Sequence, residues 1–141
     1  MRLYLDTNIL VFLLGEKKSL DNNVLEILFD YSNTFYTSTV CVHEFIHLSQ
    51  IGKISWKKQN GKPFQAEDIL ASLQEMSIEI LPITEKHLAV YASLPIIRDH
   101  RDPFDRLIIT QAISDKATLV SSDLKFQWYE KYGLDFIQNN R

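Results

Sequence analysis

The 141-residue chain contains a single cysteine, Cys41, and few glycines and prolines. One cysteine cannot form an internal disulfide, which fits a reducing compartment. No apolar run approaches the roughly 20 residues that a transmembrane helix needs. The N-terminal segment MRLYLD enters a predicted strand directly and leaves no room for a signal peptide. We therefore expect a cytoplasmic protein with no membrane partner.

Glycine-rich loops and a strongly basic charge are also missing. The glycines are isolated, so no loop of the type that cradles a nucleotide phosphate is present, and we expect no nucleotide cofactor. The net charge is −3, unlike proteins that coat nucleic acid nonspecifically. An acidic metal site remains compatible with a nuclease, because bound cations would offset its charge. The polar stretch 53–65 contains a group of lysines, which we interpret as a solvated loop: Lys53, Lys57, Lys58 and Lys62.

What the sequence does contain is an alternation of β-rich and helical patterns. Strands are expected at residues 2–5, 34–38, 78–83, 118–121 and 134–137. Helices are expected at residues 8–14, 21–32, 40–51, 66–76, between Thr84 and Pro95, and at residues 103–115 and 124–131. This order predicts one domain over residues 1–141, an α/β sandwich around a mostly parallel sheet of four to five strands.

Four acids stand where predicted strands end or where the next helix begins: Asp6, Glu44, Asp105 and Asp123. Ligands of parallel α/β sheets bind at the carboxyl ends of the strands, so we expect these acids to converge there. Converging carboxylates repel one another unless a cation lies between them, and hard oxygen ligands suit Mg²⁺ or Mn²⁺. The pattern therefore favours metal-dependent phosphodiester chemistry.

Each acid also has a purely structural interpretation. Asp6 could cap the following helix, Asp123 could be a turn residue, and Glu44 could be an ordinary exposed helix residue. In DPFDR, Pro103 favours the first helical position, which makes Asp102 the N-cap and places Asp105 inside the helix. Asp105 is therefore the better ligand candidate of the two.

A different class of enzyme is suggested by His43-Glu44-Phe45-Ile46-His47, whose letters match HExxH. In zinc metalloproteases that helix supplies two histidine ligands and a glutamate base. The match is short, and no third ligand is obvious in the sequence. We keep the protease as the leading alternative from another class.

Four segments together resemble the PIN domain, and most closely the VapC-type toxins of type II toxin–antitoxin systems: LYLDTNILVFLL, the helical Glu44, LPIIRDHRDPFDRLIITQAI and TLVSSD. The resemblance implies a three-layer α/β/α fold and a Mg²⁺- or Mn²⁺-dependent endoribonuclease. It also implies a homodimer inhibited by a cognate antitoxin. The four acids of the family fall on Asp6, Glu44, Asp105 and Asp123, and Asp102 matches a frequent extra acid. Ser121 stands where members often have threonine.

We therefore predict an RNA-cleaving nuclease whose four acids hold one or two metal ions. Auxiliary roles around the ions are expected for Thr7, Asn8, Asp102 and Ser122. Basic residues near the rim, such as Arg101, are candidates for holding the RNA backbone. Two further readings of the same fold are a housekeeping nuclease of RNA processing and a catalytically silent domain that only binds RNA or a partner.

Overall fold

A computed structural model describes residues 1–54, 61 and 64–140. Its sheet has five strands, in the order β3-β2-β1-β4-β5, and each neighbouring pair is parallel. The strands are β1 (Arg2–Leu5), β2 (Thr34–Ser38), β3 (Ile78–Leu81), β4 (Thr118–Ser121) and β5 (Asp135–Gln138). The predicted α/β class with a mostly parallel sheet is confirmed. The predicted roles of Lys57, Lys58 and Lys62 lie outside the described residues.

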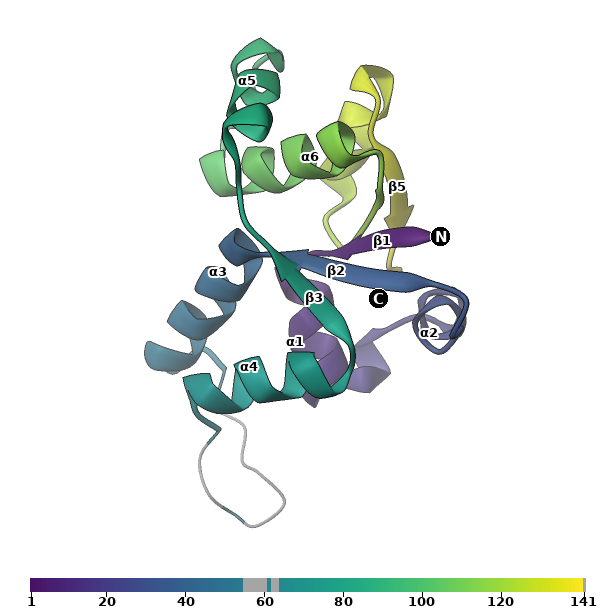
Figure 1. Cartoon of the computed structure of the whole chain (residues 1–141), viewed down its shortest axis with the longest axis vertical. Coiled ribbons are helices and arrows are strands. Elements are labelled where there is room, and N and C mark those ends of the chain that lie inside the picture. The colour runs from purple at the N-terminus through teal and green to yellow at the C-terminus, as the bar shows by residue number, and fades with distance from the viewer. Residues whose placement is uncertain (55–60, 62–63, 141) are drawn as a thin grey trace.

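Helices cover both faces of the sheet (Figure 1). They are α1 (Thr7–Gly15), α2 (Asn22–Leu28), α3 (Thr39–Gln50), α4 (Ala66–Glu75), α5 (Glu85–Ser93) and α6 (Pro103–Asp115), with 3₁₀ turns η1 (Lys17–Ser19) and η2 (Leu124–Tyr132). Figure 1 shows α1 to α4 on one side of the strands and α5 and α6 on the other. No helix in the described part of the chain is long and apolar enough to cross a membrane.

The two helical layers follow from the direction in which the chain adds strands. From β1 the chain moves outward to β2 and then β3, and right-handed crossovers put the intervening helices on one face. It then returns across the sheet to place β4 on the other side of β1. The reversed direction puts α5 and α6 on the opposite face. The three-layer α/β/α arrangement expected from the resemblance is confirmed.

The central strand is buried on both faces, as is usual for a parallel sheet covered by helices. Leu3, Tyr4 and Leu5 of β1 are each at most 1% exposed. The one polar atom among these side chains, the Tyr4 hydroxyl, donates a 2.6 Å hydrogen bond to Asp115 at the end of α6. Asp6 directly follows this buried strand.

Two elements are shorter than their sequence patterns predict. The helix expected over residues 21–32 ends at Leu28, because Asp30 forms a turn in which its carboxylate accepts hydrogen bonds from both the backbone N–H and the hydroxyl of Ser32. Tyr31 is consequently fully exposed. The strand expected over 78–83 ends at Leu81, since Pro82 has no N–H to donate to a ladder.

Candidate metal centre

All four predicted acids line one cavity of about 290 Å³ at the carboxyl edge of the sheet. Each comes from a different part of the chain: Asp6 follows β1, Glu44 lies on α3, Asp105 lies in the first turn of α6, and Asp123 follows β4. The chain order explains the convergence. Because strands are added outward from β1 in both directions, the crevice above β1 and β4 is the topological switch point, where ligands of open α/β sheets bind.

Asp6 is the most enclosed of these acids, with 6% of its surface exposed. One carboxylate oxygen, Oδ2, accepts hydrogen bonds from Ser121 Oγ at 2.7 Å and from Asn8 Nδ2 at 3.2 Å. The other, Oδ1, accepts from the Cys41 thiol at 3.7 Å. Asp6 occupies the N-cap position of α1, but its side chain makes no capping hydrogen bond. Its carboxylate is therefore directed to the cavity instead of the helix terminus.

Asp105 is half-buried and faces the other acids. Burial raises its pKa to about 8, and the nearby charges of Asp6, Asp102, Asp123 and Glu44 add to the rise. Burial likewise raises the pKa of Asp6 to about 6, although its hydrogen bond from Ser121 opposes the shift. Burial and the neighbouring charges thus disfavour the ionised forms of Asp6 and Asp105. A bound cation would instead favour these forms.

His100 and Tyr129 hold the Asp105 side chain through two successive contacts. His100 Nε2 lies 3.2 Å from Asp105 Oδ2, and His100 Nδ1 lies 2.7 Å from the Tyr129 hydroxyl. Burial lowers the pKa of His100, so the ring is neutral near pH 7 and carries one N–H. When Nε2 donates that proton to an ionised Asp105, Nδ1 is left to accept from Tyr129. This chain of contacts fixes the orientation of the Asp105 carboxylate.

Asp102 has the capping role that the DPFDR spacing predicts. Its Oδ1 accepts hydrogen bonds from the backbone N–H groups of Phe104 at 2.8 Å and Asp105 at 3.1 Å, and Pro103 occupies the first turn. Asp102 itself is exposed and is not among the residues lining the acidic cavity. The cap holds the start of α6, and through it the backbone of Asp105.

Asp123 both caps and faces the cavity. Its Oδ1 accepts from the backbone N–H of Lys125 at 3.0 Å, and its own N–H donates to Ser121 Oγ at 3.1 Å. Ser121 Oγ therefore touches both Asp6 and Asp123. The turn interpretation of Asp123 and the ligand interpretation are thus compatible, because only one carboxylate oxygen caps η2.

Two of the four auxiliary residues line the acidic cavity, and the other two, Asp102 and Ser122, do not. Thr7 and Asn8 line the cavity, and Asn8 bridges Asp6 to Ser121 Oγ at 3.1 Å. The Ser122 hydroxyl instead accepts from Asn139 Nδ2 at 2.9 Å. The serine that contacts Asp6 is its neighbour, Ser121.

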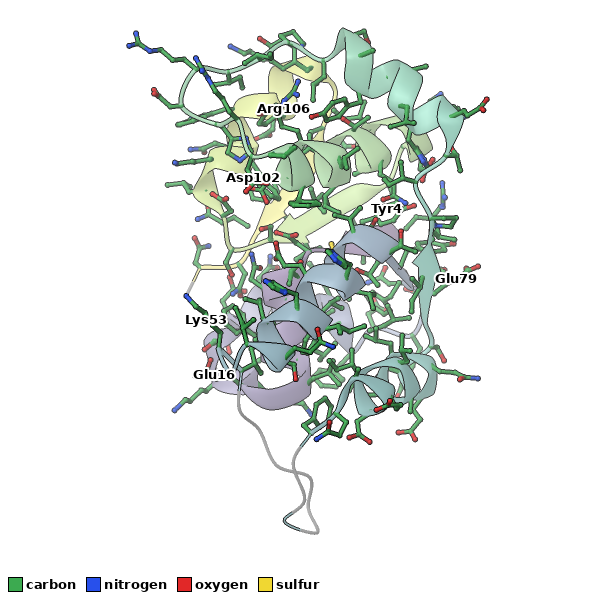
Figure 2. All side chains as sticks on the ribbon, turned by 90° about the vertical axis from the view of Figure 1, so that its left-hand side faces the viewer. Tyr4, Glu16, Lys53, Glu79, Asp102 and Arg106 are labelled. Atoms are coloured by element: carbon green, nitrogen blue, oxygen red, sulfur yellow. The ribbon has the colours of Figure 1, made fainter. Side chains whose placement is uncertain are left out.

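The sequence reasoning assigned no role in the site to His100 or Lys53. His100 begins the segment HRDPFDR, five residues before Asp105, and this spacing is the only feature of the sequence that indicates a role in the site. Lys53, interpreted from sequence as a solvated loop residue, lines the acidic cavity. Figure 2 shows Lys53 and Asp102 along the same edge of the molecule. A cation beside four carboxylates is suited to contact an anionic substrate.

The helix with the HExxH letters does not form a zinc site in the described residues. His43 and His47 are both exposed, and the His43 ring packs 6.2 Å from the Phe104 ring between centroids. The one group of three or more metal-capable side chains that the described residues bring together contains neither of them. Glu44 points to the acidic cavity instead.

The donor set fits a divalent cation. Ligand atoms of His100, Asp105 and Asp123 lie within 4.8 Å of one another, and Asp6 and Glu44 line the same cavity. Carboxylate oxygens suit Mg²⁺ or Mn²⁺, and the His100 imidazole, whose two nitrogens contact Asp105 and Tyr129, orients a carboxylate. Burial, together with the charges of the neighbouring acids, raises the pKa values of Asp6 and Asp105, so a cation held between the acids would favour their ionised forms.

Comparison with known proteins gives a consistent result. The family model described as the PIN domain matches residues 3–132. No curated protein matches the chain. Among solved structures, VapBC2 from Rickettsia felis, bound to a DNA fragment from its promoter, is similar over 99% of this chain and 100% of that one, with a TM-score of 0.71 and 25% identity.

Two other solved structures share the fold at lower identity. The DNA-bound VapBC from Salmonella typhimurium has a TM-score of 0.66 at 18% identity, covering 98% of each chain. The VapBC-5 toxin–antitoxin complex from Mycobacterium tuberculosis has a TM-score of 0.59 at 20% identity, covering 97% of this chain and 98% of that one.

Proposed function

The chain belongs to the PIN domain family, and we propose that it is a metal-dependent endoribonuclease acting as the toxin of a type II toxin–antitoxin system. The observation that carries the proposal is the convergence of Asp6, Glu44, Asp105 and Asp123 on one cavity. Four ionised acids from separate elements repel one another, and burial raises the pKa values of two of them, so a cation held between the acids would stabilise their ionised forms.

In this proposal Asp6, Glu44, Asp105 and Asp123 hold Mg²⁺ or Mn²⁺. A divalent cation held there supplies charge neutralisation at a phosphodiester and activation of a water molecule. The chain's own groups orient the ligands. Ser121 and Asn8 fix the Asp6 carboxylate by hydrogen bonds, and His100 fixes that of Asp105. Hydrogen bonds of this type set the direction and basicity of metal ligands.

The proton between His100 and Asp105 is part of the proposal. With Asp105 ionised, His100 donates from Nε2 and accepts from Tyr129 at Nδ1. With Asp105 protonated, the hydrogen bond at Nε2 reverses, and Tyr129 can donate to the His100 backbone oxygen, 3.3 Å away. Asp105 can therefore give up its proton on metal binding without leaving an unpaired buried donor. The buried Cys41 thiol, whose pKa is raised by burial, stays protonated and donates to Asp6.

The toxin assignment is supported by the structural neighbours, since VapBC-5 is described as a member of the VapBC family of toxin–antitoxin systems and VapBC2 from Rickettsia felis carries the same family name. We infer an antitoxin partner and a homodimer for this chain. Expression of the chain should arrest growth, and co-expression of the antitoxin encoded beside it should restore growth. A housekeeping RNA-processing nuclease would have the same site but would not arrest growth in this antitoxin-dependent way. Light scattering after gel filtration measures whether the purified chain is a dimer.

The central test is RNA cleavage by purified protein with and without Mg²⁺. The wild-type chain should cleave structured RNA, EDTA should stop cleavage, and Mn²⁺ should restore it. The Asp6→Asn variant keeps the side-chain shape but loses the charge, so it should fold and show no cleavage. Undiminished cleavage by this variant would contradict the site. A folded wild-type chain with no activity on a broad set of RNAs would favour the silent-domain alternative.

A further inference from the structure

A second cavity, of about 270 Å³, is lined by Ile96, Arg101 and Arg106. We name it the arginine pocket. Its two cations are sequence neighbours of site residues, since Arg101 directly precedes the N-cap Asp102 and Arg106 directly follows Asp105. Figure 2 shows Arg106 and Asp102 at the start of α6. The first turn of one helix thus borders the acidic cavity and the arginine pocket.

Arg106 is unusually buried for an arginine, with 6% of its surface exposed. One terminal nitrogen donates a 2.8 Å hydrogen bond to the backbone oxygen of Leu94, and the guanidinium stacks 4.7 Å from the centre of the Tyr91 ring. Burial raises the pKa of Tyr129, and the nearby Arg106 guanidinium opposes that rise. These contacts hold the group in place, but Nε has no hydrogen-bond partner.

None of these contacts neutralises the charge of Arg106. The ion pairs among the described residues join His87 to Asp115 and His100 to Asp105, and neither Arg101 nor Arg106 takes part in one. Arg101 is exposed and Arg106 is rigidly held. A buried cation without a counter-ion is costly. The pocket is therefore complementary to an anion that arrives from outside.

The chemistry of the lining favours a phosphate. Guanidinium groups bind phosphate oxygens through paired N–H donors, and Arg is preferred over Lys where such geometry matters. Ile96 is 70% exposed and offers an apolar surface next to the two cations. A ribose or base attached to the phosphate would cover that surface. A nucleotide within a strand presents both features together.

We propose that the arginine pocket binds a backbone phosphate of the RNA strand next to the phosphate at the metal centre. This inference rests on the proposed nuclease function, which places the scissile phosphate at the neighbouring acids. An RNA strand carries one charge per nucleotide. A strand held at the metal centre must therefore bring further phosphates close by, past the acidic rim. Arg101 and Arg106 are the cations positioned to accept one of them.

The test measures RNA binding in the full-length Asp6→Asn variant, which does not consume the probe. A short fluorescein-labelled single-stranded RNA is titrated at several salt concentrations, and fluorescence anisotropy gives Kd. Arg101→Glu should weaken binding at least about tenfold, the loss expected for a charge-assisted contact. The slope of log K against log salt should fall in magnitude by about 0.7, corresponding to one phosphate contact.

Two further variants separate the pocket from general surface charge. Arg98→Glu makes the same charge change three residues earlier, on an exposed side chain that does not line the pocket, and should have a clearly smaller effect on Kd and slope. Arg106→Lys keeps the charge but loses the paired donors, so it should weaken binding while retaining the slope. Arg101 is exposed, so its variant should keep the wild-type thermal melting profile.

The outcomes distinguish this inference from the nuclease proposal. If the wild-type chain cleaves RNA but Arg101→Glu leaves Kd and salt slope unchanged, or matches Arg98→Glu, the phosphate site is wrong and the nuclease stands. If Arg101→Glu weakens RNA binding as expected but the wild-type chain never cleaves RNA, the phosphate site stands and the nuclease proposal is wrong.

Discussion

Ser121 Oγ donates a 2.7 Å hydrogen bond to Asp6 Oδ2, joining the ends of β4 and β1 across 115 residues of sequence. The same oxygen accepts the backbone N–H of Asp123. One hydroxyl thus holds two of the four acids in register with each other. Because this hydrogen bond also lowers the pKa of Asp6, it favours the ionised form that a metal ligand needs.

Replacement of Ser121 by alanine should therefore weaken metal binding. Loss of an outer hydrogen bond to a ligand typically costs about 10-fold or more in metal affinity, and we expect a weaker Mg²⁺ affinity by about that factor. Isothermal titration calorimetry measures the affinity directly.

Ser122→Ala is the matched control for this prediction. It deletes the adjacent hydroxyl, which contacts Asn139 and not an acid, so Mg²⁺ affinity should stay close to that of the wild-type chain. Equal effects of the two substitutions would mean that Ser121 has no special relationship to the metal centre.

The stability of the metal-free chain should depend on pH through Asp105 and Asp6. Their pKa values in the folded chain, about 8 and about 6, lie above the ordinary value near 4. Between about pH 4 and pH 8 the folded state then binds more protons than the unfolded state, so these groups lose stabilisation as the pH rises. The Tm of the metal-free chain should therefore fall as the pH rises through this range, as far as these two groups determine it.

Asp105→Asn isolates this effect, because other groups such as Asp115, with a lowered pKa, change stability in the opposite direction. In EDTA, the Tm of the variant minus that of the wild-type chain should be larger at pH 8 than at pH 5. Mg²⁺ should raise the wild-type Tm more at pH 8 and have little effect on the variant. A Tm difference that is constant across this range would show that Asp105 does not have a raised pKa.

His100 should act on the metal centre through Asp105. His100→Ala removes the contact at Asp105 Oδ2 and should lower Mg²⁺ affinity by about 10-fold. Tyr129→Phe keeps the ring but removes the hydroxyl that fixes the imidazole, and should shift the pH profile of cleavage with a smaller loss of activity. Isothermal titration calorimetry measures the Mg²⁺ affinity of His100→Ala, and cleavage rates across pH measure the profile of Tyr129→Phe. An unchanged pH profile in Tyr129→Phe would rule out a role for this hydroxyl in setting the proton on His100.

Substitutions of Asp102 and Asp105 should have different effects, because Asp102 caps α6 and Asp105 is the proposed metal ligand. Asp102→Ala removes two capping hydrogen bonds at the start of α6 and should lower the free energy of unfolding by about 1 kcal/mol. Some loss of cleavage follows from a less ordered first turn, but metal-dependent activity should persist. Asp105→Asn should instead abolish cleavage. Chemical denaturation and cleavage assays make the comparison, and complete inactivation by Asp102→Ala would place Asp102 among the ligands.

The fold was predictable because its signals are local. The helix expected at residues 103–115 matches the structure, since the Asp-Pro pair at its start specifies it locally. The strand expected at residues 118–121 also matches, since a short β-rich run specifies it without tertiary information. The helix expected over 21–32 was too long because Phe29 and Tyr31 continue its apolar spacing. Only the structure shows that Asp30 turns the chain and leaves both aromatic side chains exposed.

Asp6 and Asp123 were predictable from their positions directly after strands, and Asp105 from the DPFDR spacing. Glu44 rested mostly on the family resemblance, and the supporting groups were not predictable. His100 contacts Asp105, and Tyr129 contacts His100 from 29 residues further along the chain, so no sequence period links the three residues. Ser121 and Ser122 are both plausible from sequence, since each adjoins Asp123. The choice depends on which hydroxyl faces β1 and which faces the C-terminal Asn139.

The placement of Asp6 and Asp123 at the ends of β1 and β4 has a consequence for synthesis of the protein. Asp6 follows the first strand and is translated early, whereas β4 and Asp123 are translated only after the first three strands and the helices up to α6. Contacts this distant in sequence form late in folding. Under the proposed function, a nascent chain that has not yet reached Asp123 lacks one of the four acids and cannot assemble the catalytic centre.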